Sequence, residues 1–426
     1  MTFLLGAIAD DFTGATDLAD MLVRNGMRTV LAIGTPPEDE ELPPADALVV
    51  ALKSRTCPPG EAVAASLEAL ARLQALGVRQ VLFKYCSTFD STDRGNIGPV
   101  IDALLERLGG PTIACPAFPA NGRTVYHGHL FVGDRLLSES GMRDHPLTPM
   151  RDPDLVRVLA RQSRNPVGLV PYREVAAGPA AIRGALDRMA ADGRPVAIVD
   201  ALDDDHLRAI GQACAGLPLM TGGSGIAVGL PEVFRSAGLL PDRGPEAFPA
   251  TSGASAVLAG SCSAATRGQV EAFARRHPAF RLRPERLAQG DGVAEALAWA
   301  ERRLGREPLL IYATAEPAEV AAAQAALGVE KAGALVEDAL AGIARALRAR
   351  GMGRLVVAGG ETSGAVVGAL GVRVLRIGAT IAPGVPWTVT SGPTPLGLVL
   401  KSGNFGGPDF FLEALAALEA TGERRN

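Results

Sequence analysis

The sequence predicts an α/β protein of two domains, each a mostly parallel sheet with flanking helices. Short apolar runs alternate with helical patterns along most of the chain, which is typical of a parallel sheet covered on both faces. The 426 residues exceed what one hydrophobic core usually serves. Periodicity disappears over 241–254, where Pro, Gly, Ser and Ala accumulate. We therefore expect domains at 1–240 and 255–426, joined by this linker, with the active site in the interdomain cleft.

The expected elements of the first domain follow from apolar runs and amphipathic stretches between turn residues. The expected strands are 3–9, 29–33, 47–51, 80–85, 112–115, 167–170, 196–200 and 218–221. The expected helices are 15–25, 60–76, 97–108, 153–164, 180–191, 204–215 and 225–234. The stretch 123–137 departs from this pattern. It alternates around a central glycine, which predicts an inserted β-hairpin.

The second domain repeats the alternation of strands and helices. Its expected strands are 255–260, 309–313, 355–358, 372–377 and 396–401. Its expected helices are 266–276, 293–304, 318–326, 334–350, 363–370 and 409–418. Apolar helices such as 318–326 are compatible with a homo-oligomer.

Composition and charge argue against several classes of protein. Hydrophobic residues make up 47% of the chain and charged residues 21%, as in soluble globular proteins. The net charge of −4 and the lack of a Lys/Arg cluster argue against a nucleic-acid partner. The cysteines show no metal or C-x-x-C spacing, which indicates reduced thiols. The apolar run 3–9 is too short to span a membrane and has no cationic flank. We therefore expect no signal peptide, no membrane partner and a cytoplasmic protein.

Two adjacent carboxylates, Asp10 and Asp11, follow the first expected strand, and a Thr-Gly pair then opens a helix. Ligands of parallel sheets bind beyond the carboxyl ends of the strands. One carboxylate could accept a hydrogen bond or a proton from a substrate hydroxyl, while the positive end of the helix favours an anion. Alternatively, one aspartate caps the helix and the other is a solvated turn residue. We favour substrate binding, and we expect Asp17 and Asp20 on the helix surface.

The loop KYCSTFDST, which begins at Lys84, places a cation, hydroxyls and an acid between a strand and a helix. Lys84 could hold a carboxylate, and Ser87 and Thr88 could bind hydroxyls. Asp90 could accept the proton of an alcohol. The alternative is a polar loop in which a hydroxyl residue caps the next helix. We favour ligand binding, because a solvated loop does not need a lysine at the end of a strand.

A glycine-rich turn, TGGSGIA at 221–227, precedes another expected helix. Its backbone amides could face an anion, which makes Gly223 and Ser224 candidates. The spacing fails the dinucleotide fingerprint, since Val228 stands where the last glycine belongs. A tight turn without a ligand is nearly as consistent with this pattern.

Three small-residue turns follow three expected strands of the second domain. They are Gly260-Ser261-Cys262, GGETSG at 359–364 and KSGNFGG at 401–407. Together they would line one crevice, where backbone amides could hold a triphosphate and Glu361 could orient Mg²⁺ through water. The chain has no Walker A sequence. We therefore expect a nucleotide site outside the P-loop class.

The histidines form no recognisable catalytic arrangement. His127 and His129 share an H-x-H spacing that would place both on one strand face. Without a third ligand of known spacing, a polar hairpin face is favoured over a metal site. His145 stands in a proline-bounded loop that could border the active site.

Taken in order, several of these segments resemble the four-carbon acid sugar kinases. The motifs are IADDFTGA at 8–15, the segment 84–98, TGGSG at 221–225, GGETSG at 359–364 and KSGNFG at 401–406. The resemblance extends from Leu5 to about Phe411, nearly the whole chain. It implies a sugar-acid-binding N-terminal domain and an ATP-binding C-terminal domain.

The resemblance also implies roles for individual residues. Those facing the sugar acid would be Asp10, Asp11, Lys84, Ser87, Asp90, Gly223 and Ser224. Those facing the nucleotide would be Ser261, Gly359, Gly360, Glu361, Thr362, Ser363 and Gly403. No metal ligand can be assigned.

Three segments indicate a branch of this family. Members that act on threonate or erythronate typically carry Lys-x-Asp-Ser-Thr-Leu-Arg-Gly, whereas this chain has KYCSTFDST. That loop, CPAFPANGRTVY at 115–126 and HPLTPM at 145–150 resemble the branch that phosphorylates the terminal 4-hydroxyl of 3-oxo-tetronates.

The expected reaction is therefore phosphoryl transfer from ATP, with Mg²⁺, to a small sugar acid. Lys84 would hold the carboxylate, and Asp11 or Asp90 would position and deprotonate the hydroxyl. The alternatives are a D-threonate or D-erythronate 4-kinase of the same family. A hydroxy-acid dehydrogenase is disfavoured by the failed fingerprint. A non-catalytic sugar-acid sensor is the remaining rival class.

Overall fold

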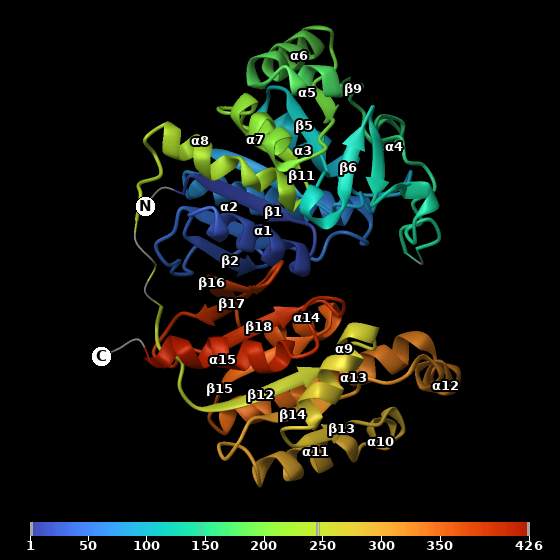
Figure 1. The fold of residues 1–426 in the computed structure, drawn as a ribbon, viewed down its shortest axis with the longest axis vertical. Coiled ribbons are helices and arrows are strands. Elements are labelled where there is room, and N and C mark those ends of the chain that lie inside the picture. Colours follow the sequence, from blue (N-terminus) through green and yellow to red (C-terminus); the bar gives the residue numbers. More distant parts are fainter. Residues whose placement is uncertain (1–2, 146, 244–245, 247, 424–426) are drawn as a thin grey trace. The chain divides into compact units, whose positions relative to one another are not determined.

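The computed structural model describes residues 3–145, 147–243, 246 and 248–423 (Figure 1). The chain forms two compact units, an N-terminal unit of residues 1–245 and a C-terminal unit of residues 246–426. The boundary falls inside the segment 241–254, of which residues 244, 245 and 247 lie outside the described part. Within the described residues, no helix combines the length and the apolar character needed to cross a membrane.

The main sheet of the N-terminal unit contains only parallel strand pairs. In spatial order its strands are β2 (Thr29–Ile33), β3 (Ala47–Ala51), β1 (Leu5–Ala9), β4 (Gln80–Lys84), β11 (Leu219–Gly222), β5 (Thr112–Cys115), β10 (Val196–Val199) and β9 (Val167–Val170). Because the strands run the same way, their carboxyl ends meet at one edge, where ligands of such sheets bind. The residues that follow β3, β1 and β4 are therefore neighbours, although they are far apart in the chain.

Strand β1 reads LGAIA and is buried along its whole length, as expected of a strand covered on both faces. The helices are α1 (Phe12–Arg24), α2 (Pro59–Ala75), α3 (Ile97–Leu108), α4 (Leu155–Gln162), α5 (Tyr172–Ala176), α6 (Pro179–Ala191), α7 (Asp204–Ala213) and α8 (Leu230–Ser236). The helix expected over 225–234 is instead a 3-10 segment, η3 (Ser224–Val228), followed by α8. Pro231 in the first turn of α8 explains the division, because proline favours a helix start.

The expected hairpin is present and has a third strand. It comprises β6 (Arg123–Tyr126), β7 (His129–Val132) and β8 (Arg135–Leu136), all antiparallel, flanked by the 3-10 turns η1 (Pro119–Asn121) and η2 (Leu137–Glu139). His127 lies in the tight turn with a φ of 49°, not on the strand. The buried Asp200 carboxylate holds this turn by accepting the His127 amide at 2.7 Å and the Gly128 amide at 2.8 Å. The expectation that His127 and His129 share one strand face is therefore wrong.

The C-terminal unit has a mixed sheet. In spatial order its strands are β13 (Ala279–Arg281), β14 (Leu309–Tyr312), β12 (Ala254–Ala259), β15 (Met352–Ala358), β18 (Gly397–Lys401), β17 (Val385–Thr390) and β16 (Val374–Ala382). The pairs β16–β17 and β17–β18 are antiparallel and the other pairs are parallel. Strand β17 is not among the strands expected from the sequence, and it contains Pro386, a residue that is unusual in a strand interior. Its register with β16 is irregular where Pro386 pairs.

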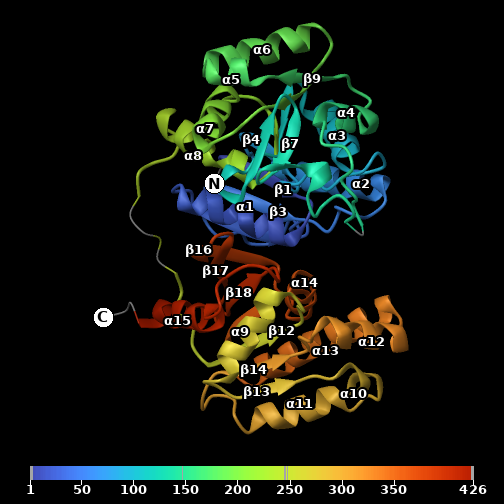
Figure 2. The ribbon, with the colours of Figure 1, turned by 45° about the vertical axis from the view of Figure 1, so that its right-hand side comes forward.

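Helices cover this sheet and enclose its core. They are α9 (Ala264–Ala274), α10 (Pro284–Ala288), α11 (Gly292–Glu301), α12 (Pro317–Leu327), α13 (Val329–Ala349), α14 (Gly360–Ala369) and α15 (Phe410–Glu423). Part of the core packs Val257 and Val399 of the sheet against Phe273 of α9 and Phe410 of α15. Both helices lie on the near side of the sheet in Figure 1. Helices α12 and α13 pack against each other, and α10 packs on α13 (Figure 2).

Candidate active site

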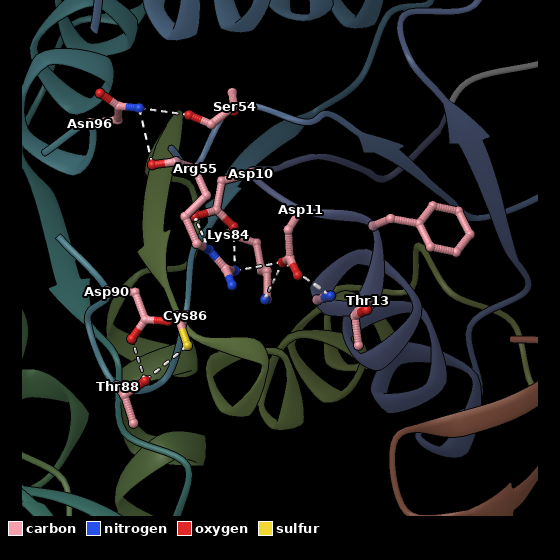
Figure 3. A network of polar contacts seen from close by, with 12 residues as sticks. Asp10, Asp11, Thr13, Ser54, Arg55, Lys84, Cys86, Thr88, Asp90 and Asn96 are labelled. Atoms are coloured by element: carbon pink, nitrogen blue, oxygen red, sulfur yellow. Dashed lines mark hydrogen bonds and ion pairs between the residues drawn. The ribbon is translucent and has the colours of Figure 1, made fainter. Parts of the chain in front are cut away.

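Four charged side chains meet at the carboxyl edge of the N-terminal sheet (Figure 3). Asp10 and Asp11 follow β1, Lys84 ends β4, and Arg55 lies in the loop after β3. The Arg55 guanidinium donates to both oxygens of Asp10, through Nε at 3.0 Å and Nη2 at 2.8 Å. The same Nη2 donates to Asp11 Oδ1 at 2.5 Å. The order β3–β1–β4 therefore builds a compact cluster of two acids and two cations.

Asp11 has a second, structural role as the cap of α1. Its Oδ1 accepts the Gly14 amide at 3.1 Å, which is the capping role of the alternative that the sequence analysis did not favour. Asp10 is not the solvated turn residue of that alternative, since it is 5% exposed and paired with Arg55.

Lys84 is the least saturated member of the cluster. Its side chain is 4% exposed, and its Nζ lies 3.6 Å from Asp11 Oδ1, an ion pair longer than a hydrogen bond. Within the described residues, the Lys84 ammonium donates no hydrogen bond. A buried ammonium that keeps its donors is suited to an anionic ligand.

Burial and charge act in opposite directions on the two aspartates. Burial raises the pKa of Asp10 above its ordinary value, and pairing with Arg55 offsets this only in part. Burial also acts to raise the pKa of Asp11, but the charges of Lys84 and Arg55 and the Gly14 amide outweigh it, so this pKa is lowered. Asp11 is therefore held as a carboxylate.

Arg55 was not anticipated from the sequence. Its loop is held by Asn96, whose Nδ2 donates to the backbone oxygens of Ser54 at 2.6 Å, Arg55 at 3.1 Å and Cys57 at 2.9 Å. The signal that could have found it is LKSRT at 52–56, a basic segment directly after a buried strand. This is the argument that selected Lys84.

The loop after Lys84 carries the other expected residues. Asp90 accepts a hydrogen bond from the Thr88 hydroxyl at 2.5 Å, and the Cys86 thiol lies 3.0 Å from that hydroxyl (Figure 3). Burial raises the pKa of Cys86 to about 11, and the charges of Asp90, Arg55 and Lys84 also act on this thiol. The loop therefore lies close to the cluster. Ser87 is half-buried within it.

The glycine-rich turn is explained by packing. A Cβ at Gly222 would lie 2.4 Å from the Cys115 carbonyl oxygen, and one at Gly223 would lie 2.8 Å from that of Pro116. Only glycine allows β11 to approach the end of β5 so closely. Ser224 is buried, and its hydroxyl acts to lower the pKa of Asp17.

The expectation that Asp17 and Asp20 lie on the helix surface is wrong. Asp20 is fully buried and Asp17 is half-buried. Burial raises the pKa of Asp17, and the charge of Lys84 opposes this rise. The rotation of α1 therefore turns Asp17 toward the charged cluster, which residue spacing alone did not reveal.

The C-terminal unit contains a cavity of about 840 Å³ at the carboxyl ends of β12, β14 and β15. Among the residues expected to bind a nucleotide, those lining it are Ser261, Gly359, Gly360, Glu361 and Thr362. Apolar side chains of α12 and α13, such as Val320 and Val336, line another part. Ser363 and Gly403 do not line the cavity. A Cβ at Gly403 would nevertheless lie 2.2 Å from Ser261 Oγ, so the two residues are adjacent.

This cavity fits a nucleoside triphosphate. Gly359, with a φ of 129°, precedes α14 and has a Cβ position 3.2 Å from the Ser261 amide nitrogen, a close approach suited to backbone binding of phosphates. The volume lies in the range of small-molecule sites. The described residues contain no cluster of His, Cys, Asp or Glu able to hold a metal ion by itself.

Two comparisons with families of known proteins agree with this division. A family described as a sugar-binding N-terminal domain matches residues 5–230. A family described as a nucleotide-binding C-terminal domain matches residues 256–411.

Individual relatives are similar over nearly their full length. The chain is 63% identical to 3-oxo-tetronate kinase of Cupriavidus necator, covering 97% of both chains. It is 61% identical to that of Burkholderia multivorans, covering 98% of this chain and 97% of the relative. Two crystal structures are also similar. A Haemophilus influenzae protein of the DUF1537 family shows 42% identity and a TM-score of 0.84, covering 97% of this chain and 100% of that one. A Salmonella typhimurium protein proposed to be a tRNA synthase shows 43% identity and a TM-score of 0.88, covering 96% and 98%.

A sugar-binding domain followed by a nucleotide-binding domain is the composition of a small-molecule phosphotransferase. The chain belongs to the four-carbon acid sugar kinase family and is a kinase that uses ATP.

Gly14→Ala tests the position of Lys84. The new Cβ would lie 1.8 Å from Lys84 Nζ and 2.3 Å from Asp11 Oδ1, so the ammonium must move. We expect kcat/KM for the sugar acid to fall by about 10²-fold, the scale of a 1 Å misplacement. Gly60→Ala, with nothing within 4 Å of its Cβ, is the matched control and should leave kcat/KM unchanged. Equal kcat/KM in both variants would contradict the assigned role of Lys84.

Proposed function

We propose that this kinase transfers the γ-phosphoryl group of ATP to the 4-hydroxyl of a 3-oxo-tetronate, giving 3-oxo-tetronate 4-phosphate. The relatives with this activity in their names support the substrate. The observation that carries the proposal is Lys84, a buried ammonium with unused donors beside two carboxylates. This combination suits an acid that also bears hydroxyl groups.

In the proposed complex, Lys84 donates to the substrate carboxylate. Asp10, Asp11 and Arg55 hold each other, and through Asp11 they hold the ammonium in place. Ser87, with the turn at Gly223 and Ser224, would contact the substrate from the adjacent loops.

Asp90 is the better candidate to accept the proton of the reacting hydroxyl. Its carboxylate accepts a hydrogen bond from Thr88, whereas Asp11 is stabilised as an anion by two cations. A carboxylate stabilised in this way is a weak base. Asp11 therefore acts on substrate position, and Asp90 acts on the proton.

In the C-terminal unit, the amides around Ser261 and from Gly359 to Ser363 would bind the phosphates of ATP, with Gly403 beside them. Mg²⁺ would arrive with ATP and neutralise phosphate charge, with Glu361 orienting it through water. The protein would supply alignment and exclusion of water. Transfer requires the γ-phosphoryl group and the sugar-acid hydroxyl to meet during turnover.

The substrate is tested by coupled ADP release with a 3-oxo-tetronate, D-threonate and D-erythronate. The oxo acid should be prepared immediately before the assay and separated from the hydroxy acids, because a 3-oxo acid loses CO₂ on storage. We expect kcat/KM to be at least ~10-fold higher for the oxo acid, which corresponds to about one good polar contact. A higher kcat/KM for threonate or erythronate would assign the chain to the other branch of its family. NAD(P)H consumption without ADP release would indicate the dehydrogenase alternative.

The two aspartates should separate in their kinetics. Asp90→Asn should lower kcat by ~10²–10⁴-fold, the usual contribution of a positioned base. Asp11→Asn should mainly raise KM for the sugar acid, because Lys84 and Arg55 lose the anion that positions them. The Kd for ADP, measured by calorimetric titration, should be unchanged in both variants. The opposite pattern, with kcat lost only in Asp11→Asn, would exchange the two roles.

A further inference from the structure

The Gly403 carbonyl oxygen of the C-terminal unit accepts three side-chain hydrogen bonds. The donors are Ser263 Oγ at 2.6 Å, Thr266 Oγ1 at 2.8 Å and Lys401 Nζ at 3.0 Å. Lys401 also donates to Thr266 Oγ1 at 3.1 Å. Residues from the end of β18 and the start of α9 therefore fix one peptide group.

Gln269 extends this arrangement along the same turn. Its side chain is buried, and its Nε2 donates to the carbonyl oxygens of Phe405, Gly406 and Gly407, each at 3.0 Å. The carbonyls of this turn thus converge on side chains of α9. Side-chain donors determine the conformation of the whole turn.

The fixed carbonyls determine where the amides point. In a trans peptide the C=O of one residue and the N–H of the next point in opposite directions. The N–H groups of Asn404, Gly406 and Gly407 therefore point away from the side chains that hold the carbonyl oxygens. In the part of the chain that is described, none of these three amides donates to a protein acceptor. Successive free amides of this kind bind anions.

Lys401 places a buried positive charge beside this turn, which the hydrogen bonding of the turn does not require. Its side chain is 2% exposed, and it forms no ion pair with any described carboxylate. Burial lowers its pKa to about 8. The Phe410 ring is also nearby, with its centroid 6.0 Å from Nζ. Two neutral hydroxyls already bind the same carbonyl, so an unpaired buried charge here is unfavourable unless an anion arrives nearby.

We propose that Lys401 is a positioning residue for nucleotide phosphates, which fixes the Gly403–Asn404 peptide so that its N–H faces the phosphate chain. The inference rests on the proposed function and deepens it. The turn is adjacent to the cavity, because Gly403 packs on Ser261, which lines it. Lys401 acts through the peptide and through its charge, and it does not contact the nucleotide.

The test is calorimetric titration of the full-length protein with ADP and with adenosine. Lys401→Met should weaken ADP binding by about tenfold or more, the size of one charge-assisted hydrogen bond. Adenosine has no phosphates, so its Kd should change by less than about twofold, within the scatter of minor contacts. The KM for the sugar acid should be unchanged. If the role of Lys401 were purely structural, the variant would bind ADP and adenosine more weakly by the same factor.

Thr266→Val provides a second variant, should Lys401→Met fail to fold. It removes a donor to the same carbonyl oxygen. It should also weaken the binding of ADP but not that of adenosine, by a smaller factor than Lys401→Met. Thr388→Val is its matched control, because Thr388 is a buried threonine of the same unit whose hydroxyl donates to Leu398 O at 3.0 Å. This control should bind both ligands normally.

The outcomes separate the inference from the function on which it rests. Normal ADP binding by folded Lys401→Met and Thr266→Val would overturn the inference and leave the kinase assignment intact. Failure of the unaltered protein to bind either ligand would overturn both.

Discussion

Compensation of buried charge at the carboxyl edge of the N-terminal sheet is the constraint on which the site depends. Asp10 and Lys84 are almost inaccessible to solvent, and ions in such positions are unfavourable unless they are paired. Arg55 pairs with both aspartates, and Lys84 lies beside one of them. Removing one member would leave the others uncompensated. The cluster therefore keeps its geometry before any ligand arrives, which is what recognition of a small acid requires.

In the proposed function, the two units use different physical means to bind an anion. The N-terminal unit relies on charged side chains that neutralise each other while leaving one ammonium with free donors. The C-terminal unit relies on backbone amides, which strand ends and turns of small residues bring close together. Phosphates suit the second arrangement because many weak dipoles can surround several oxygens. A single carboxylate suits the first.

Much of this could be predicted from the sequence, within a definite limit. Asp10, Asp11 and Lys84 were identified because each directly follows an apolar run, which is a local property of the chain. Arg55 was missed because it meets Asp10 only through the order β3–β1–β4, and strand order is not visible in a linear pattern. Asp17 was misplaced for a related reason, since its direction depends on the rotation of α1.

The same limit applies to the fold. The parallel strands of the N-terminal unit were expected because apolar runs alternate with helical patterns along the chain, and these strands are indeed almost wholly buried. Strand β17 was missed, and it contains Pro386, which is unusual in a strand interior and pairs with β16 in an irregular register. Strand β13 was also missed, because it is half-exposed throughout and lacks an apolar run. Tertiary context therefore decided the elements that local patterns did not.

The most direct test of the central claim compares a sugar acid with its neutral amide. D-threonate and D-threonamide differ only in the group assigned to Lys84, and calorimetry measures the Kd of each. The unaltered protein should prefer the acid by about tenfold or more, the strength of a charge-assisted hydrogen bond. Folded Lys84→Met should lose this preference. If Lys84→Met retained the full preference for the acid, the carboxylate would bind elsewhere and the account would be wrong.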